Sequence, residues 1–588
     1  MRLKPAQAYF LAFTAIFAVL AGFVFWGTWS LSACPVMPDA QMFFHESGYV
    51  ADFLRDRIAS GKFVPWDLTA FVGSPYLWQE LQYALAAYFA ALGLAYYLRG
   101  RGLSRLSSYG AGLFLGFCGY WLTLYSAGHA GWFRWMTYGV FAFGLADRAV
   151  RKNKTKNWVL LGACVAWASF YQPDLWLLFT IFTGAYFIWC CVRERKWPDW
   201  RGVGVAALAF FVIGGPSFVG SYRDKEGRDR QIEESKGSAL TGGKQADDRE
   251  ARWIFVTNWS MPPAETLEFF IPRLNGDTSC QSVLSLGGSQ ATGVRPYTGA
   301  LGRPINAKSG NYRQHSLYVG WITCLLALAG IVLGRRNREV VFFAVAALVF
   351  WVLSTGRYCE PVYRLVFMLP IGDSIRAPVK WHHLTELCLC ALAGFGLEYV
   401  RRLLVERFSL KPRIVCVALC SVVVFGACDL ARIDRLYCAA VDLSVVQARN
   451  PAADEIIKRG GGVVADMIQG GSGPIAWSFG ARRLNLVQNP SGEDVRFVWA
   501  TVAQASDSGF AAWLKARNAM PVGAYAVTPK AIRDTNSRAA NVMLFELPGA
   551  PANQVAEPET PPVTFVTWLG VISLLATIGV SIYGVKMA

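Results

Sequence analysis

Twelve long apolar runs, joined by short charged connections, decide the solvent in which this chain can fold. A membrane-spanning helix needs roughly 20 mostly apolar residues. The runs that meet or approach this length lie at 8-31, 82-98, 107-126, 132-149, 157-172, 175-192, 203-221, 316-334, 339-355, 382-400, 412-430 and 563-584. The sequence therefore predicts a mainly α fold, a polytopic transmembrane helical bundle of about 12 spans.

Basic residues gather in alternate short connections and predict the orientation of this bundle. The basic pieces are Arg2 with Lys4, Arg99 with Arg101, Arg151 to Lys154, Arg193 to Lys196, Arg335 to Arg338, and Arg401 with Arg402. By the positive-inside rule both termini of this multi-pass protein are predicted to be cytoplasmic. This pattern explains most of the formal net charge of +17, and no nucleic-acid motif accompanies it, so no nucleic-acid partner is predicted.

Two features of the chain leave alternative readings. The piece Leu31-Ser32-Ala33-Cys34 is typical of a lipoprotein cleavage box, but the apolar run before it is longer than a cleaved signal, so an uncleaved signal anchor is favoured. Ten of the 14 cysteines fall in or beside apolar runs, where cysteine acts as a small hydrophobic residue. Neither a disulfide framework nor a CxxC metal pair is indicated.

The predicted topology divides the chain into three parts. Residues 1-430 form the transmembrane module, with outer loops 32-81, 222-315 and 356-381. Residues 431-562 alternate short apolar strands, near 462-465 and 542-545, with helices near 452-459 and 506-518. This alternation predicts a small extracytoplasmic α/β domain. Residues 563-588 hold the final transmembrane helix.

The first outer loop holds the candidate catalytic residue. Asp39, His45 and Glu46 follow the first span closely and fall near the membrane surface. A carboxylate at this position can act as general base towards an acceptor hydroxyl. The alternative is structural, because Asp39 lies between Pro38 and an amphipathic helical stretch and suits an N-cap, whereas Glu46 suits a solvated helix face.

Further polar residues fall at the same predicted depth in two tight turns. His129 lies in the turn Ala127 to Gly131, with Arg134 just inside the next span, and Gln172 and Asp174 flank Pro173 in the next outer turn. Ionisable residues near spans are costly and often mark a ligand path. The alternatives are a structural turn histidine and an arginine that reaches back to the interface.

The segment before the tenth span, Gly372 to His383, carries candidate phosphate ligands. Arg376 can bind a phosphate through two nitrogens and Lys380 as a point charge. An interfacial anchor of basic and aromatic residues is an equal alternative. The pair His382-His383 has no HExxH motif or spaced Cys/His set beside it, so no metal ligand is predicted, and a divalent metal stays an open alternative.

Several enzyme and transporter classes are disfavoured by what the sequence lacks. It contains no GxxxxGK[ST] phosphate loop, no GxGxxG placed after a strand and no GxSxG. The ionisable residues of the spans, such as Arg134, Asp147 and Glu386, lie near span ends, whereas an ion-coupled carrier places charges near the midplane. The polar groups therefore indicate a site at the outer leaflet.

Several short motifs, taken in their order along the chain, resemble those of a known family. Asp39, Val64-Pro65-Trp66-Asp67, Gly73-Ser74-Pro75 and Gln82-Tyr83 resemble the first outer loop of the bacterial YfhO-like membrane proteins, which have the architecture of C-type, polyprenyl-phosphate-sugar-dependent glycosyltransferases. Later matches are Tyr125 to His129, Trp259 to Glu265 with Pro272 and Gly276, Tyr297 to Gly299, Tyr318 to Gly320, Ile375 to Pro378, and Ala393 to Glu398. The chain departs at Asp67, where the family often has Asn, and residues 431-562 give no match.

The resemblance implies a function and assigns Asp39 as the catalytic residue. It implies an integral membrane glycosyltransferase that moves a sugar from a polyprenyl phosphate to a glycan, lipid or protein acceptor of the cell envelope. Asp39 would take the acceptor proton, while Arg134, Arg376 or Lys380 stabilises the departing phosphate. The alternatives are a lipid or polysaccharide transporter and a membrane scaffold without catalysis.

Overall fold

Helices dominate the structure, and each of the twelve predicted apolar runs overlaps one of them. The computed structural model describes residues 4–25, 33–35, 75–123, 130–170, 173–215, 248–276, 297–301, 316–369, 372, 375–438, 440–442, 451–467, 485–487, 495–527, 540–549 and 571–580. The long helices are α1 (Pro5–Val24), α3 (Pro75–Gly100), α4 (Arg105–Gly116), α6 (Ala130–Lys152), α7 (Thr155–Ser169), α8 (Pro173–Glu194), Trp200–Gly215, α12 (Trp321–Leu333), α13 (Arg338–Ser354), α15 (His382–Arg402), α16 (Pro412–Asp434) and Val571–Val580.

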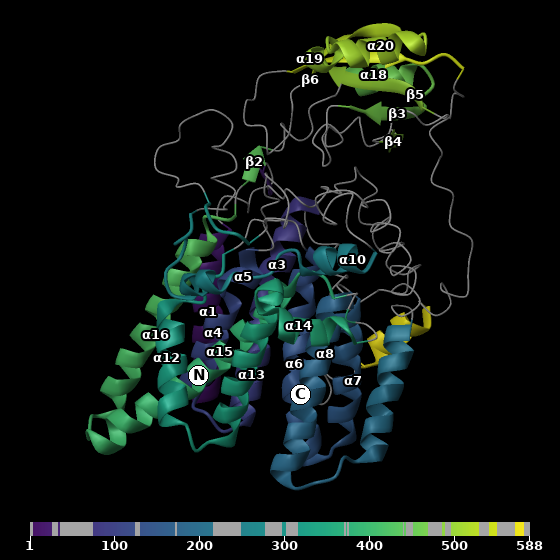
Figure 1. Cartoon of the computed structure of the whole chain (residues 1–588). Helices are drawn as coiled ribbons and strands as arrows, with labels where there is room; N and C mark the ends of the chain where they lie inside the picture. The colour runs from purple at the N-terminus through teal and green to yellow at the C-terminus, as the bar shows by residue number, and fades with distance from the viewer. Residues whose placement is uncertain are drawn as a thin grey trace.

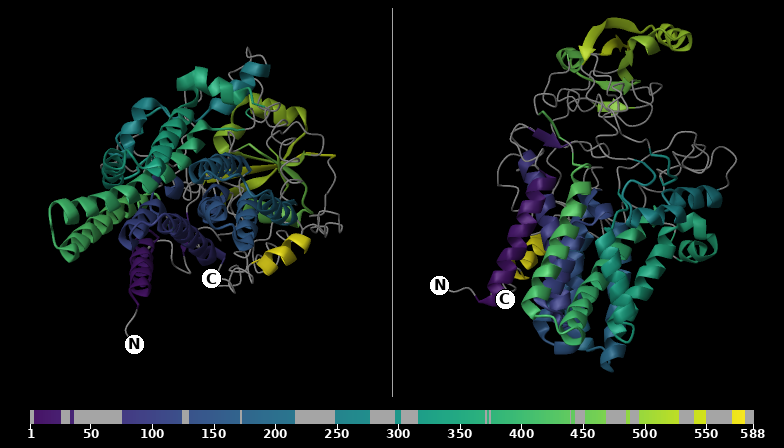
Figure 2. Two further views of the ribbon diagram at one scale, coloured as in Figure 1. Left: turned by 90° about the horizontal axis from the view of Figure 1, so that it is seen from below. Right: turned by 90° about the vertical axis from the view of Figure 1, so that its left-hand side faces the viewer.

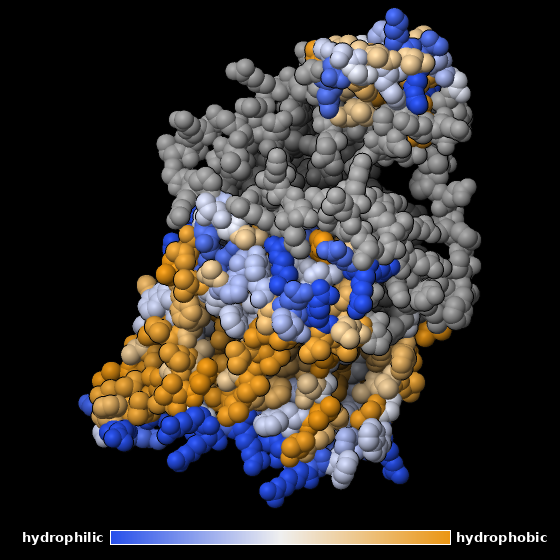
Figure 3. Space-filling view, in the orientation of Figure 1, coloured by the Kyte–Doolittle hydropathy of each residue, from blue (hydrophilic) through white to orange (hydrophobic). Residues whose placement is uncertain are grey.

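Some of these helices can cross a bilayer by their length and composition. Pro5–Val24, Asp174–Glu194 and Pro412–Asp434 qualify singly, and α13 with the chain Gly356–Phe367, bent by 107°, qualifies as a broken span. The other helices within the described ranges are shorter or less apolar, so the count of about 12 spans stays a prediction. Figure 3 shows an apolar band with hydrophilic side chains below it. The chain is therefore a membrane protein.

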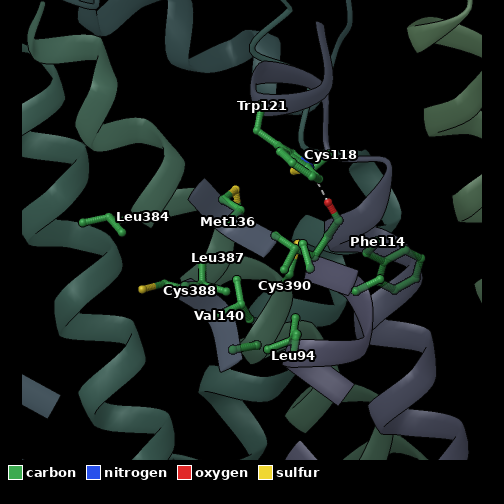
Figure 4. Packing of buried hydrophobic residues seen from close by; sticks show 14 of the residues in the cluster. Leu94, Phe114, Cys118, Trp121, Met136, Val140, Leu384, Leu387, Cys388 and Cys390 are labelled. Atoms are coloured by element: carbon green, nitrogen blue, oxygen red, sulfur yellow. Dashed lines mark hydrogen bonds between the residues drawn. The ribbon is translucent and has the colours of Figure 1, made fainter. Parts of the chain in front are cut away.

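Glycines allow the central helices to approach closely. Gly330 of α12 and Gly396 of α15 face the partner helix, where an added Cβ would lie 2.4 Å from the Leu392 oxygen and 1.9 Å from the Leu326 oxygen, respectively. Small residues at such contacts are the usual means of packing helices in lipid. Figure 4 shows the apolar core beside this contact, where Leu94, Phe114, Val140 and Leu387 are buried, as are the thiols of Cys388 and Cys390.

Buried charges occupy the two ends of the bundle. At one end, which we call the basic face, Asp147 binds Arg101 at 3.2 Å, Arg151 at 2.6 Å and Arg193 at 2.9 Å, and Glu339 also pairs with Arg193. The opposite end, which we call the loop face, lies under α10 (Asp248–Thr257) and the sheet strands in Figure 1. The described helices thus confine their buried ionisable side chains to their ends.

Two helices differ from the predicted runs. The run 107-126 is broken after α4, and α5 (Gly119–Thr123) follows, because the Gly119 N–H donates to the Tyr318 oxygen at 2.9 Å instead of continuing the helix. The predicted outer loop 356-381 contains η4 (Gly356–Cys359), the helix α14 (Glu360–Phe367) and the 3₁₀ turn η6 (Pro378–Trp381). The sharp turn between α13 and α14 occurs at Gly356, whose φ is +48°. Glycine tolerates that angle without a Cβ clash.

A five-stranded mixed sheet lies near the C-terminus of the chain. Its strands are β3 (Val463–Asp466), β4 (Asn485–Val487), β5 (Val495–Thr501), β6 (Met520–Val527) and β7 (Ala540–Glu546), in the order β4-β3-β5-β7-β6. The sheet pairs β3 in parallel with β4 and β5, and pairs β7 antiparallel with β5 and β6.

Each face of this sheet has its own apolar core. Val464, Phe497 and Trp499 face α18 (Pro451–Lys458), while alternate residues such as Val463 and Val498 pack with Leu514 of α20 (Ser508–Ala516). This alternation follows from the two-residue period of a strand. Figure 2 shows the sheet apart from the helical bundle. The short helix α19 (Val502–Ala505) follows β5 directly.

The close contact of α12 and α15 predicts a strong dependence on glycine size. Gly396→Ala should lower the unfolding temperature by several degrees in detergent, because its Cβ would overlap the Leu326 backbone oxygen. Gly184→Ala on α8, where nothing lies within 4 Å, is the matched control and should unfold like the parent protein. Thermal unfolding followed by size-exclusion chromatography measures both. Equal unfolding temperatures for the two variants would contradict this packing.

Candidate functional site at the loop face

A buried ion pair joins two of the predicted site residues. Lys380 of η6 binds the carboxylate of Asp174, which lies in the first turn of α8, and both side chains are almost fully buried. Pro173 directly precedes Asp174, and Pro378 lies two residues before Lys380. The fixed φ of proline suits the first position of a helical turn. Two residues that are 206 positions apart in the chain are thus brought together. Removing one partner of such a pair leaves a buried unpaired charge, at a cost of about 3–5 kcal/mol.

Arg376 lies just before this pair, on an aromatic platform. Its guanidinium carbon is 4.2 Å from the ring centre of Phe255 on α10 and 4.6 Å from that of Trp259. Such cation–π contacts hold the planar guanidinium group in place. Arg376 is half-buried, whereas Lys380 is fully buried. Of the two predicted phosphate ligands, Arg376 is the more accessible.

The backbone around Arg376 is strained and held in place. Ala377 and Trp259 both have positive φ values, +62° and +59°, which are unfavourable for residues with a side chain. The Ala377 N–H donates to the Val256 oxygen at 2.9 Å, and the Val379 N–H donates to the Trp259 oxygen at 3.2 Å. Strained residues of this kind persist only where the surroundings hold them and cluster at functional sites.

The next turn of the chain carries a cluster that we call the buried carboxyl cluster, formed by His382, His383, Glu386 and Asp434. All four side chains are fully buried. Glu386 accepts the Tyr120 N–H at 2.8 Å, and its oxygens lie 3.8 Å from His382 Nε2 and from His383 Nδ1. Those two contacts are too long for hydrogen bonds.

Asp434, at the end of α16, completes this cluster. Among the described residues neither oxygen of its carboxyl group has a hydrogen-bond partner, and Glu386 is close enough to interact with it electrostatically. Burying an ionised carboxyl group without hydrogen bonds costs free energy. Protonation of the group, or a ligand that hydrogen-bonds to it, would remove this cost. The sequence analysis missed Asp434 as a site residue. Its signal was a second acidic side chain, after Asp429, at the end of a mainly apolar 23-residue helix.

Two pieces of the long outer loop meet beside this cluster in a second acidic group. Glu265 of η3 (Pro263–Phe269) accepts the Tyr297 hydroxyl and the Ala300 N–H, each at 2.6 Å. Glu268 accepts both the backbone and the side-chain N–H of Asn275 at 2.9 Å. The ring of Phe269 lies 4.5 Å from that of His382, so η3 contacts the buried carboxyl cluster directly.

Burial makes Glu268 a weak acid. It raises the pKa of Glu268 to about 7, and this effect outweighs the two hydrogen bonds from Asn275, which favour the carboxylate. Burial also raises the pKa of the neighbouring Tyr297 hydroxyl, with a further contribution from the charge of Glu265. A carboxyl group that titrates near neutral pH can give or accept a proton under working conditions.

The other predicted site residues lie beyond what the structure describes. Asp39, His45, Glu46, His129 and Gln172 fall outside the described residues, and of Arg134 only the backbone, in α6, is described. The chain entering the first outer loop is placed by β1 (Ala33–Pro35), which pairs antiparallel with β2 (Ala440–Asp442). β1 ends four residues before Asp39, and β2 follows α16 and Asp434 by a few residues.

The described His, Cys, Asp and Glu side chains of the loop face are not grouped as a metal site requires. In the described part of the chain no three His, Cys, Asp or Glu residues are placed to hold a metal ion. What the arrangement does offer is one accessible guanidinium, buried carboxyl groups next to two imidazoles, and an apolar bundle beneath them. These groups suit an anionic ligand and proton transfer.

Comparisons with known proteins give one structural similarity. No protein-family model matches the chain, and no curated protein matches it, so the YfhO-like resemblance stays a prediction. The chain is similar to the cryo-EM structure of the arabinofuranosyltransferase AftD from Mycobacteria, with 13% sequence identity and a TM-score of 0.46 over 94% of this chain. This chain covers 40% of the length of that protein.

The buried ion pair predicts a double-mutant cycle with a large interaction energy. Asp174→Asn and Lys380→Met should each destabilise the protein by about 3 kcal/mol, because each leaves one buried charge unpaired. The double variant should lose less than the sum of the two single losses, since it leaves no unpaired charge. Denaturant unfolding in detergent measures all three. Strictly additive losses would contradict the pair.

The pKa of Glu268 predicts a pH-dependent stability. A raised folded-state pKa means that folding takes up a proton, so the stability present at low pH is lost as pH rises from the unfolded value towards about 7. The unfolding temperature difference between the parent protein and Glu268→Gln should therefore change between pH 5 and pH 8, roughly, in favour of the variant at high pH. Glu360→Gln, at an exposed carboxylate paired with Arg364, should show no such change. A pH-independent difference for Glu268→Gln would contradict this account.

Proposed function

We propose that this protein is a glycosyltransferase that moves a sugar from a polyprenyl-phosphate donor to an acceptor hydroxyl. The observation that carries the proposal is the segment from Arg376 to Glu386, which sets an accessible cation beside fully buried acid and imidazole groups at one end of an apolar bundle. Both termini would be cytoplasmic, so the arginine-rich basic face lies inside and the loop face lies at the outer surface of a bacterial cytoplasmic membrane.

The donor lipid would approach along α14. The axis of this helix is bent by 107° from that of α13, and exposed apolar side chains lie on it at Leu365 and just after it at Met368 and Leu369. An amphipathic helix at the membrane surface presents such residues to acyl chains. The ring of Phe367 lies 5.4 Å from that of Trp253 on α10, the helix whose Phe255 supports Arg376. The isoprenoid chain would therefore lie against α14 while its phosphate meets Arg376.

The reaction would be a single displacement. The acceptor oxygen attacks the anomeric carbon of the donor sugar, the bond from that carbon to the phosphate oxygen breaks, and polyprenyl phosphate leaves with both electrons of that bond. Asp39 would receive the acceptor proton as general base. Arg376 would stabilise the leaving phosphate, an effect that grows as charge develops in the transition state.

The remaining predicted residues would have supporting roles. The pair of Lys380 with Asp174 would hold the segment that carries Arg376, so the contact with phosphate falls first on Arg376. His45, Glu46, His129, Arg134 and Gln172 would line the sugar and acceptor positions. The acceptor would be a glycan, lipid or protein of the cell envelope, and no step of this scheme uses a metal.

Two other functions remain as alternatives, a lipid or polysaccharide transporter and a membrane scaffold without catalysis. A transporter needs a polar path through the span centres. The buried ionisable side chains of the described helices lie at the basic face and at the loop face, with apolar packing between them. A scaffold would not need an accessible arginine on a strained backbone, so this distribution favours the enzyme.

Substitution of Arg376 tests the proposed donor site. Arg376→Ala should lower transfer from a synthetic polyprenyl-phosphate sugar on the order of ten- to a thousandfold, and Arg376→Lys should lower it less, because Lys keeps the charge but loses the planar fork. Arg517→Ala is the matched control, since Arg517 also lies over an aromatic ring, 4.6 Å from that of Trp513, but at the end of α20 and away from the loop face. Its rate should stay within a few-fold of the parent. Near-parent rates for Arg376→Ala would remove Arg376 from the mechanism.

A further inference from the structure

A cavity opens at the basic face, at the other end of the bundle from the candidate site. It has a volume of about 250 Å³ and lies between the end of α6, the start of α7, the end of α8 and the connection to helix 200–215. Its lining includes Asn153, Trp158, Cys191, Lys196 and Asp199. This volume equals that of about eight water molecules at ~30 Å³ each, enough for a phosphate with a small polyol attached.

The turn that carries Lys196 has a fixed backbone. Arg195 has a positive φ of +52°, and the Lys196 N–H donates to the Cys191 oxygen at 3.0 Å. On the other side of the cavity, Trp158 Nε1 donates to Asn153 Oδ1 at 2.9 Å, which leaves the Asn153 amide N–H group available as a donor. The cavity is thus bounded by ordered turns on two sides.

The positive charge around this cavity is only partly neutralised. The nearby Arg151 and Arg193 are bound to Asp147, but within the described ranges Lys152, Lys154, Arg195 and Lys196 have no carboxylate at ion-pair distance. The opposing carboxylate is Asp199, which accepts the Arg201 N–H at 3.2 Å at the start of helix 200–215. Of the charged residues, Lys196 and Asp199 line the cavity, while Lys152, Lys154 and Arg195 are the chain neighbours of the lining residues Asn153 and Lys196. The cavity therefore lies in a basic stretch of the chain, which favours an anion.

The surfaces next to the cavity are those of a protein in contact with lipid. Trp197 and Trp200 are 90% and 70% exposed, and exposed tryptophans of this kind are enriched at membrane interfaces. Beyond them, Ile188 and Val192 on α8 and Phe211 on helix 200–215 expose apolar side chains along the bundle. An amphiphile with an anionic head at the cavity would find an apolar surface for its chains on either helix.

We propose that this cavity is a binding site for the headgroup of an anionic phospholipid. The phosphate would bind Lys196 in the lining, with Lys154, next to the lining residue Asn153 in the chain, as a second cation. The Asn153 amide would donate to the headgroup, and the acyl chains would lie along α8 and helix 200–215. Basic pockets between transmembrane helices commonly bind such headgroups. The site is separate from Arg376 and does not rest on the proposed transferase activity.

Native mass spectrometry of the purified, delipidated full chain tests this site. Titration with phosphatidylglycerol and with phosphatidylcholine should show one phosphatidylglycerol bound at least tenfold more tightly. The variant Lys154→Gln/Lys196→Gln should lose most of that preference, on the order of ten- to thirtyfold. Each basic group near the membrane surface adds a similar small amount to the binding free energy of an anionic lipid. Cys191→Phe, which fills the cavity and keeps every charge, should lose it too.

The control variant is Arg335→Gln/Arg336→Gln, which removes the same charge from the connection between α12 and α13. It should keep the parent preference. Thermal unfolding identifies a misfolded variant. One cavity variant removes charge and the other fills the space, so either variant that folds is enough to decide the outcome. No preference in the parent protein, an equal loss in the control, or an unchanged preference in a folded cavity variant would overturn the proposal.

Discussion

The buried ion pair between Lys380 and Asp174 is the contact on which the loop face depends. It fixes the start of α8 against the turn η6, and that turn leads without a break into α15. Charges inside an apolar bundle are stable only when paired, so the two elements cannot separate without a large loss of free energy. Arg376 on one side of η6 and the buried carboxyl cluster on the other are positioned by this single attachment.

Backbone hydrogen bonds hold the strained residues of the same segment. Hydrogen bonds from Ala377 and Val379 tie the segment to Val256 and Trp259, and two of these residues keep positive φ values. Helix α10 then supplies the aromatic face under Arg376. The guanidinium is held before any ligand arrives, which is the arrangement that electrostatic stabilisation of a leaving group requires.

The sequence predicted the elements of this fold better than their contacts. Runs of about 20 apolar residues form helices because backbone polar groups must be satisfied internally in lipid, and every run overlaps a helix. The break after α4 was not predictable, because it depends on Gly119 meeting the Tyr318 oxygen. The sequence likewise placed Asp174 and Lys380 at one depth without showing that they bind each other. Asp434 was missed because its neighbour Glu386 comes from a different helix.

Analysis of the reaction products shows whether the loop face breaks the bond between a sugar and a lipid phosphate. Purified protein in proteoliposomes would receive a polyprenyl-phosphate sugar labelled on both the sugar and the lipid, together with a cell-envelope extract as acceptor source. Free polyprenyl phosphate and an equal amount of labelled sugar on a new acceptor are expected, and both should be lost in Arg376→Ala. Intact donor that crosses the bilayer uncleaved, or that stays unchanged, would rule out this reaction.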